Sequence, residues 1–471
     1  MNICIPFVLL MLIGIQAAGQ TDSILPVRTE TVTPVHKTSF NNEGQCAERK
    51  QGGNPREVNG YLAFDGAMDG NRQVDPQIAV GGGYVLHGTN NGLTIYNKKG
   101  EFLQGVSQKC FSNGIDPKIF YDAHNKVFGF DLWVYWDSAK IKPVNVSVSE
   151  TSDPRGAWNT YPVSASKGVD GGGIGYSKKW IGYSFPGGDE RTFVLRMADA
   201  KKGVPTTIYH FPGSLGHPVF GQDDTDDLYF FEIVRNEFVI RRVTEGADGN
   251  PVCVTVSKKP HGLTSMGSPP QSPQYNTQQK VSSGDRNPKN LVLQNGYIWF
   301  SQAIKYQGRA AVQWPLKVGD SVYSTFDHLD RAAVQWHQVD AADGSIVQTG
   351  LVHSDTTNYI QTTIAVNKNN DVLLGFQEAN ANMFVSPRMA YRYASDAPGT
   401  VREIVRLGEG KGAADGVAWG DYSSSVVDGD DLKTLWTIQS RANEKGRGET
   451  VIVRHEMPET KKLKKVKKGK K

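Results

Sequence analysis

Residues 116–133, DPKIFYDAHNKVFGFDLW, contain the pattern that decides the fold. A charged residue is followed by a short apolar run, a polar turn, and a second apolar run that ends in polar residues. This is the pattern of two antiparallel strands joined by a turn. Because the same unit recurs along the chain, the sequence contains an internal repeat.

The repeats predict a β-propeller. Seven units begin at residues 75, 116, 170, 217, 287, 361 and 421. Their spacings lie near or above the roughly 40 to 50 residues that a four-stranded blade needs. The longer spacings indicate inserted loops, of which the clearest runs from Thr264 to Asp285 and is rich in Ser, Pro and Gln.

The two ends of the repeat region fit together. The last unit has too few strands before Met457, whereas Val58 to Phe64 reads as a strand without a blade. The sequence therefore predicts an all-β fold, a seven-bladed β-propeller over residues 58–457 that is closed by an N-terminal strand. Closure removes the free sheet edge that would invite aggregation. The 51 Gly and 23 Pro residues agree with this interpretation, because they interrupt any long helical period.

The chain ends predict export. Residues 1–19 have the apolar core and the small residues of a signal peptide, and residues 20–57 form a polar segment. Residues 458–471 form a basic tail that we expect to be disordered, with eight lysines among the last eleven residues. We therefore expect a secreted protein, extracellular or at the cell surface, and no later run is long enough to span a membrane.

The charge distribution argues against nucleic-acid binding. Without the tail lysines the chain holds 44 Lys and Arg against 48 Asp and Glu, so its body is mildly acidic. A nucleic-acid-binding body would need a dense basic face, and none precedes the tail. We expect no specific nucleic-acid partner, and an extracellular polyanion as a partner of the tail.

Cysteines and one sequon predict covalent features of an exported chain. Three cysteines remain after the leader, which predicts one disulfide and one free thiol. Cys46 and Cys110 flank the first predicted sheet and are the preferred pair, leaving Cys253 free. Asn145-Val146-Ser147 is a glycosylation sequon and predicts a glycoprotein if the source is eukaryotic.

Two turns carry a family resemblance. Residues 152–158, SDPRGAW, and 395–400, SDAPGT, are similar to the Asp-box hairpins of secreted sialidase-like (BNR repeat) propellers. The resemblance implies architecture, with the Asp and Gly satisfying a tight turn and the Trp packing between blades. Propellers of this family include glycosidases, polysaccharide lyases and binding scaffolds, so the resemblance leaves the function open. The arginine pattern of a sialidase is missing, so sialidase activity is not expected.

The repeat also predicts a site. The start of each innermost strand and the end of each second strand should open on one face, at the mouth of the central channel. Asp75, Asp116 and Asp170 lie at three such starts, and His87 ends a second strand. Clustered carboxylates and a histidine can act as acid and base, so these four are the candidate catalytic residues. The metal content stays unknown: no cofactor is expected, with Ca²⁺ as the ion that such carboxylates could hold. The alternative is that each Asp only caps a turn.

Other polar and aromatic residues at the mouth suit sugar recognition. Hydroxyl groups need paired donors and acceptors, and sugar rings stack on aromatic faces. The candidate ligand-binding residues are His217, Arg286, Asn90, Asn91, Trp133, Tyr183, Glu232, Gln302, Gln377 and Arg441.

Three functions remain open at this point. The leading hypothesis is a secreted, monomeric propeller that recognises an extracellular glycan or matrix polymer at the mouth. The first alternative is a carbohydrate-active enzyme, a glycosidase or polysaccharide lyase, that uses the mouth carboxylates or His87. The second alternative is a structural scaffold of the extracellular matrix or cell surface.

Overall fold

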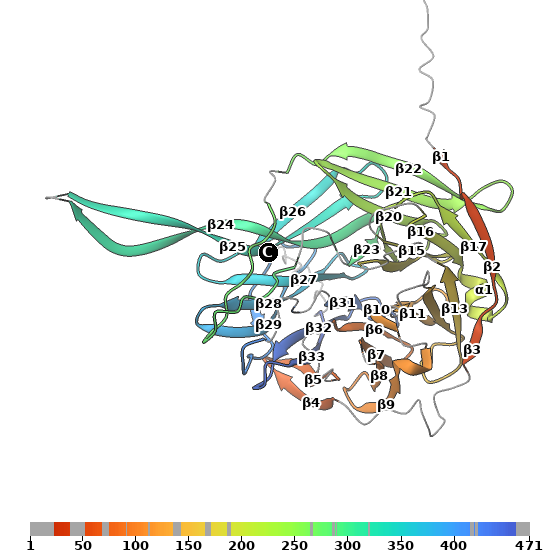
Figure 1. Ribbon diagram of the computed structural model, residues 1–471, viewed down its shortest axis with the longest axis horizontal. Helices are drawn as coiled ribbons and strands as arrows, with labels where there is room; N and C mark the ends of the chain where they lie inside the picture. The colour runs from red at the N-terminus through yellow and green to blue at the C-terminus, as the bar shows by residue number, and fades with distance from the viewer. Residues whose placement is uncertain are drawn as a thin grey trace, which may run out of the picture.

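The computed structural model forms a ring of antiparallel sheets around a central axis, an all-β propeller (Figure 1). One short α-helix, α1 (Met197–Lys202), and one 3-10 turn, Gln108–Phe111, interrupt the strands of the described part. The structure describes residues 23–37, 52–67, 75–90, 92–111, 114–134, 143–164, 171–185, 190–263, 267–284, 288, 290–318, 321–414, 419 and 423–457.

Hydrogen bonding connects the described strands into six sheets, each built on an antiparallel meander. The first three meanders follow one another along the chain and belong to three different sheets. The first is β6 (Gln77–Gly81), β7 (Tyr84–Thr89), β8 (Gly92–Asn97) and β9 (Phe102–Ser107). The second is β10 (Gly114–Asp122), β11 (Val127–Val134), β12 (Pro143–Ser149) and β13 (Trp158–Ser164). The third meander is β14 (Gly173–Tyr176), β15 (Trp180–Ser184), β16 (Thr192–Arg196) and β17 (Thr206–Phe211).

The remaining meanders complete the ring. They contain β18 (His217–Pro218), β20 (Leu228–Val234), β21 (Glu237–Glu245) and β22 (Pro251–Pro260); then β23 (Leu291–Gln294), β24 (Tyr297–Val318), β25 (Ser321–Asp340) and β26 (Ile346–Val352). Next come β27 (Asn358–Val366), β28 (Val372–Asn380), β29 (Met383–Arg392) and β30 (Ile404–Arg406). The last is β31 (Ser424–Val427), β32 (Leu435–Ala442) and β33 (Gly448–His455), with β5 (Tyr61–Asp65) and β4 (Gly53–Val58) beside it.

The predicted seven blades do not appear as seven sheets, because hydrogen bonding gives six among the described strands. Two meanders, β14–β17 and β23–β26, belong to one sheet of ten strands. They are joined by the two-residue strand β19 (Phe220–Gly221), which pairs in parallel with both β14 and β23. β5, which overlaps the predicted segment Val58–Phe64, pairs antiparallel with β33.

The N-terminal segment adds strands to three outer edges, which the sequence analysis did not predict. β3 (Val35–Lys37) pairs with β13, β2 (Arg28–Val32) with β17, and β1 (Ser23–Ile24) with β22. Figure 1 shows β1 to β3 along the rim of the ring. An ion pair of Arg28 with Glu190 and a hydrogen bond between the His210 ring and the Glu30 carboxylate fix this segment. Its strands cover sheet edges that would otherwise be free.

Aromatic side chains fill the space between neighbouring sheets. Trp158 is fully buried and its ring packs against Phe111 and Phe130. In the same predicted Asp-box turn, the Asp153 carboxylate accepts a hydrogen bond from the Arg155 backbone N–H, and the Trp158 indole donates to the Pro154 carbonyl. The turn therefore has a structural role, as the resemblance implies.

The inner turns on the far face of the ring bind one another. The Asp430 carboxylate accepts hydrogen bonds from the N–H groups of Gly82 and Gly83, at 2.7 and 2.9 Å. Asp223 does the same for the N–H groups of Asn295 and Gly296. Carboxylates bound to backbone N–H groups of the next turn act as clasps between meanders. Asp430 and Asp223 therefore hold neighbouring turns together.

The covalent predictions have mixed outcomes. Cys253 is a free, buried thiol, as expected of one cysteine. Cys110 is disulfide-bonded, but Cys46 lies outside the described residues, so their pairing stays a prediction. The burial of Asn145 argues against the predicted glycosylation site. Asn145 lies inside β12, between Leu132 and Pro162 of the flanking strands.

Candidate functional site at the channel mouth

Each predicted repeat start lies in or within four residues of an innermost strand, β6, β10, β14, β18, β23, β27 or β31. The seven meanders therefore follow the repeat. Two of these starts have a bulge of the same kind. The pairing of β10 with β11 shifts between Ile115 and Lys118, and that of β27 with β28 shifts between Ile360 and Thr363.

The residues inside the two bulges have left-handed backbones. Asp116 has φ 55° and Gln361 has φ 51°. This conformation is uncommon outside glycine, and it is strained further at Asp116 because the next residue is proline. Backbone strain of this kind persists where the surrounding structure holds it, and it often accompanies functional sites.

A hydrogen-bonded chain links the first two meanders beside Asp116. The Asn90 side chain donates to the Asp75 carboxylate at 2.9 Å, and its carbonyl oxygen accepts from the Asp116 backbone N–H at 2.7 Å. Asp75 is buried, whereas Asn90 and Asp116 are half-buried. Asp75 therefore orients Asn90, and Asn90 in turn fixes the position of Asp116.

A buried acid–base pair lies one step deeper. Asp131 and Lys118 are opposite one another in the β10–β11 pairing, and the Asp131 carboxylate accepts from the Lys118 backbone N–H at 2.8 Å. Burial raises the pKa of Asp131 to about 7, the Lys118 charge opposes that rise, and the nearby Asp116 carboxylate adds to it. A side chain at Gly173 would collide with the Lys118 ammonium group, so the glycine leaves room for this lysine.

This arrangement can do two things chemically. A half-buried carboxylate beside a fixed amide offers hydrogen-bonding groups to a polar ligand. A carboxyl group whose pKa lies near neutrality can hold or release a proton under ordinary conditions. We call Asp75, Asn90, Asp116, Lys118 and Asp131 the acidic half of the mouth.

The opposite half of the mouth is neutral and closely packed. The Gln361 amide donates to the carbonyls of Ser282 and Trp419, and the Trp419 indole donates to Gln377 at 2.8 Å. The described part of the inserted loop, residues 267–284, packs here, with Val281 and Trp419 fully buried in one apolar cluster. The described part of the inserted loop is therefore packed against the body of the propeller at the mouth. We call Gln361, Gln377, Trp419 and residues 267–284 the neutral half.

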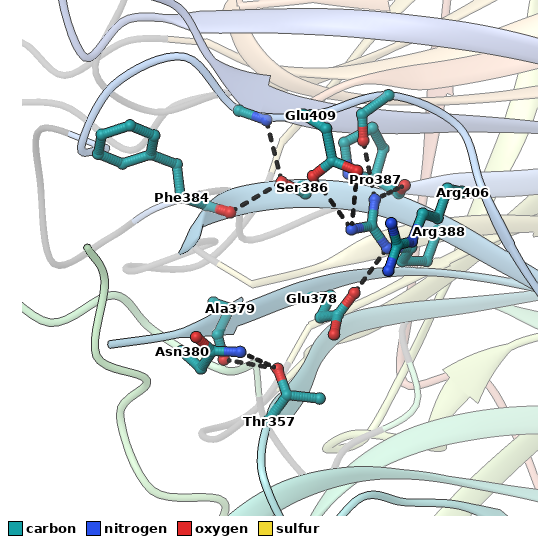
Figure 2. Close-up of polar contacts among 12 residues, drawn as sticks. Thr357, Glu378, Ala379, Asn380, Phe384, Ser386, Pro387, Arg388, Arg406 and Glu409 are labelled. Atoms are coloured by element: carbon teal, nitrogen blue, oxygen red, sulfur yellow. Dashed lines mark hydrogen bonds and ion pairs between the residues drawn. The ribbon is translucent and has the colours of Figure 1, made fainter. Parts of the chain in front are cut away.

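A charged network borders the neutral half. Figure 2 shows the guanidinium of Arg388 between the carboxylates of Glu378 and Glu409. It also donates to the carbonyls of Pro387 and Gly408. Arg388 is only 1% exposed, so these bonds satisfy a charge that would be costly to bury alone.

Several predicted ligand-binding residues are committed to internal contacts. Glu232 forms an ion pair with Arg241, and Arg441 with Glu449. Gln302 donates to Gln335, and Gln377 accepts from Trp419. Tyr183 is buried in an apolar cluster, against which Trp133 packs, and His217 pairs with Phe231 in the sheet.

His87 has the wrong environment for a base in contact with solvent. It is fully buried, and its Nδ1 accepts a hydrogen bond from the Ala67 backbone N–H. Burial lowers the pKa of His87 to about 3, so the ring stays neutral across the physiological range. The sequence pattern places His87 near the mouth, but its side chain lies between two sheets.

Asp170, Asn91 and Arg286 lie outside the described residues. Within the described ranges, no group of three or more His, Cys, Asp or Glu side chains could hold a metal ion. The Ca²⁺ hypothesis thus depends on Asp170 and stays a prediction. Nor does any helix in the described part have the length and apolarity to cross a membrane.

The sequence analysis missed Lys118, Arg388 and Trp419 as parts of the mouth. Lys118 carried a usable signal, because a lysine two residues after Asp116 interrupts an otherwise apolar inner strand. Arg388 and Trp419 carried none, since their roles depend on Glu409 and Gln377, which lie 21 and 42 residues away along the chain.

Comparisons with known proteins find solved structures of low similarity only. No protein-family model and no curated protein matches it. One similar structure is a Dyadobacter fermentans protein of unknown function, with 11% identity, TM-score 0.36, and coverage of 91% of this chain and 99% of that one. Another is a Fusarium graminearum α-L-arabinofuranosidase, with 8% identity, TM-score 0.32, and coverage of 91% and 98%.

A third similar structure is a polysaccharide lyase, an ulvan lyase, with 10% identity and TM-score 0.29. It covers 88% of this chain and 82% of that chain. Similarities of this size do not carry an activity from those proteins to this one.

Proposed function

We propose that the protein is an extracellular propeller that binds a polysaccharide at the acidic half of its mouth. The observation that carries the proposal is the chain from Asp75 through Asn90 to Asp116, which fixes a half-buried aspartate at the start of an inner strand. Carboxylate and amide groups held in place are suited to the hydroxyl groups of a sugar. In the neutral half, the Gln361 amide donates to the inserted loop and to Trp419, and the Gln377 carbonyl oxygen accepts from the Trp419 indole.

We propose that this propeller has seven blades. Five sheets contribute one meander each, and the ten-stranded sheet contributes two. The pairing of β5 with β33 supports closure of the last blade by an N-terminal strand. The Asp430 and Asp223 clasps support this count, because each connects the inner turns of adjacent meanders.

A binding experiment with matched variants tests the proposal. The protein is titrated with a panel of neutral and anionic polysaccharides by isothermal calorimetry. Asp116→Asn should weaken binding about tenfold or more, corresponding to about 1.4 kcal/mol. Asp224→Asn makes the same chemical change at an exposed far-face carboxylate and should leave the affinity unchanged. Equal affinities of the two variants would contradict the proposed site.

The second candidate function is a glycosidase or polysaccharide lyase, which the Asp131–Lys118 pair favours. A carboxyl group with a pKa near 7 could donate a proton to a leaving group. Incubation with the same polysaccharides, followed by assays for reducing ends and unsaturated products, would detect turnover. Asp131→Asn should abolish turnover and retain binding. If no polymer that binds yields a product, the result would support the binding function and contradict the enzymatic one.

The basic tail is the second proposed contact with a polymer. Eight lysines among the last eleven residues should attract a polyanion in a salt-dependent manner. Truncation after Glu459 should abolish retention on heparin at physiological ionic strength without changing the melting temperature. Equal retention of both forms would locate the basic surface in the body of the protein.

A further inference from the structure

The hexapeptide Arg-Ala-Ala-Val-Gln-Trp occurs twice, at residues 309–314 and 331–336. The two copies belong to β24 and β25, which are 22 and 20 residues long. These strands form a long hairpin that projects from the ring (Figure 1). The first copy is in the projecting part of β24, and the last three residues of the second copy, Val334–Trp336, pair with β26.

The second copy lies in a closely packed part of the sheet. Ala332, Ala333, Val334 and Trp336 are all fully buried. The Trp336 ring stacks on Trp299 with centroids 6.4 Å apart. Each residue of this stretch is therefore selected by its surroundings, and the first copy carries the same six side chains.

A shift of 22 residues would bring the first copy into this position. In the structure, Tyr306 pairs with Arg331 and Ser301 with Trp336. After the shift the same residues would pair with Arg309 and Trp314. Gln307 and Gly308 would then form a two-residue hairpin loop. A glycine at the second loop position suits the type I′ turn that such hairpins favour.

The residues that follow the two copies differ, and they decide between the registers. His337 follows the second copy and pairs with Phe300 on one side and Thr349 on the other. Pro315 stands at the equivalent place after the first copy. Proline has no N–H for a central strand, so it disfavours the shifted register.

A second difference acts in the same direction. Val339 is fully buried and pairs with Ile298. Lys317 would take its place in the shifted register, and burying an unpaired lysine is costly. We propose that Pro315 and Lys317 set the strand register of this sheet, because they exclude the first copy of the hexapeptide from the position that the second copy occupies.

Hydrogen–deuterium exchange of the full-length protein tests this inference. In the wild type, amides of residues 331–340 should exchange as one slow population. Pro315→His with Lys317→Val removes both obstacles, so the same peptide should show a second, fast population of at least about a tenth of the molecules. Adding Trp314→Ala removes the side chain that the first copy needs and should restore the single slow population.

Each outcome of that experiment decides the inference. A single slow population in the double variant would overturn it. A fast population that persists with Trp314→Ala would also overturn it, because local unfolding and not exchange of the copies would then be the cause.

A deletion variant covers the case in which the double variant does not fold. Removing residues 309–330 leaves one hexapeptide and joins Gly308 to Arg331, so Gln307 and Gly308 must form the turn. The variant should fold, with a melting temperature within a few degrees of the wild type. Failure to fold would show that this turn cannot close the hairpin and would refute the alternative register.

Discussion

The two halves of the mouth use the same backbone bulge for different purposes. Gln361 and Asp116 occupy equivalent positions at the starts of inner strands, and both have left-handed backbones. Gln361 directs its amide into two carbonyl groups of packed loops. Asp116 lies half-buried, fixed through its backbone by Asn90, next to a buried carboxyl group.

This difference indicates that one half of the mouth contributes mainly to stability and the other half mainly to binding. In the neutral half, buried polar groups hold an inserted loop in place, so changes there should lower stability. In the acidic half, Asp116 is half-buried and Asp131 has a raised pKa, so changes at Asp116 should alter binding at little cost in stability, and changes at Asp131 should alter the pH dependence. The following variants test that division, from the largest expected effect to the smallest.

Trp419→Ala should have the largest effect. Trp419 is fully buried against Val281 and donates to Gln377, so its removal leaves a cavity and an unpaired amide. We expect a loss of about 3 to 5 kcal/mol in the free energy of unfolding, measured by chemical denaturation. Tyr275→Ala is the control, because Tyr275 belongs to the inserted loop that packs against Trp419 but is itself 50% exposed. Similar losses in both variants would mean that the loop is not anchored through Trp419.

Glu378→Ala should come next. It removes the nearer carboxylate from the Arg388 guanidinium, 2.7 Å away, and leaves a buried charge with weaker partners (Figure 2). We expect a loss of about 3 kcal/mol. Glu409→Ala, which removes a 56% exposed carboxylate from the same arginine, should cost much less. Thermal denaturation of both variants measures the difference, and a reversed order would disprove this account of the network.

Glycine at the two bulges compares the halves directly. Asp116→Gly and Gln361→Gly both relieve a left-handed backbone, and Gln361→Gly also removes the hydrogen bonds to the carbonyls of Ser282 and Trp419. We expect Gln361→Gly to be less stable than Asp116→Gly by about 2 kcal/mol, and Asp116→Gly to stay within about 1 kcal/mol of the wild type. Equal stabilities in urea denaturation would show that the bulges do not differ as proposed.

The smallest effects should appear as opposite pH slopes. The pKa of Asp131 is raised to about 7 in the folded state, so its contribution is present below its unfolded pKa and is lost as pH rises through 7. The pKa of His337 is lowered to about 3 by burial, so its contribution is present above pH 6.5 and is lost as pH falls. Asp131→Asn should flatten the melting-temperature profile between about pH 4 and 7, and His337→Gln should flatten it between about pH 4 and 6.5. Unchanged profiles would contradict these assignments.

The sequence predicted the fold class and the location of the inner strands well. Alternating apolar runs and polar turns report local strand formation, and their recurrence requires a repeat architecture. The pattern also predicted Asp75 and Asp116 at the mouth. It could not show that Asn90 connects these two residues, because that contact depends on how two meanders dock.

The failures have a common physical cause. His87 and Asn145 have suitable types at suitable positions, but each lies buried, in the space between sheets or within one. Glu232, Gln302 and Arg441 find partners in neighbouring strands. A strand pattern gives the face of the sheet on which a side chain lies, and it does not give the residue that it meets there.

The sequence by itself determined that the chain forms an all-β ring of repeated meanders, because strand propensity and turn chemistry are local properties. The tertiary structure alone decided that residues 23–37 line three outer edges, that residues 267–284 pack into the mouth, and that Lys118 lies beside Asp131. These features depend on contacts between segments far apart along the chain. Their energies come from burial and from pairing, and both exist only once the sheets have come together.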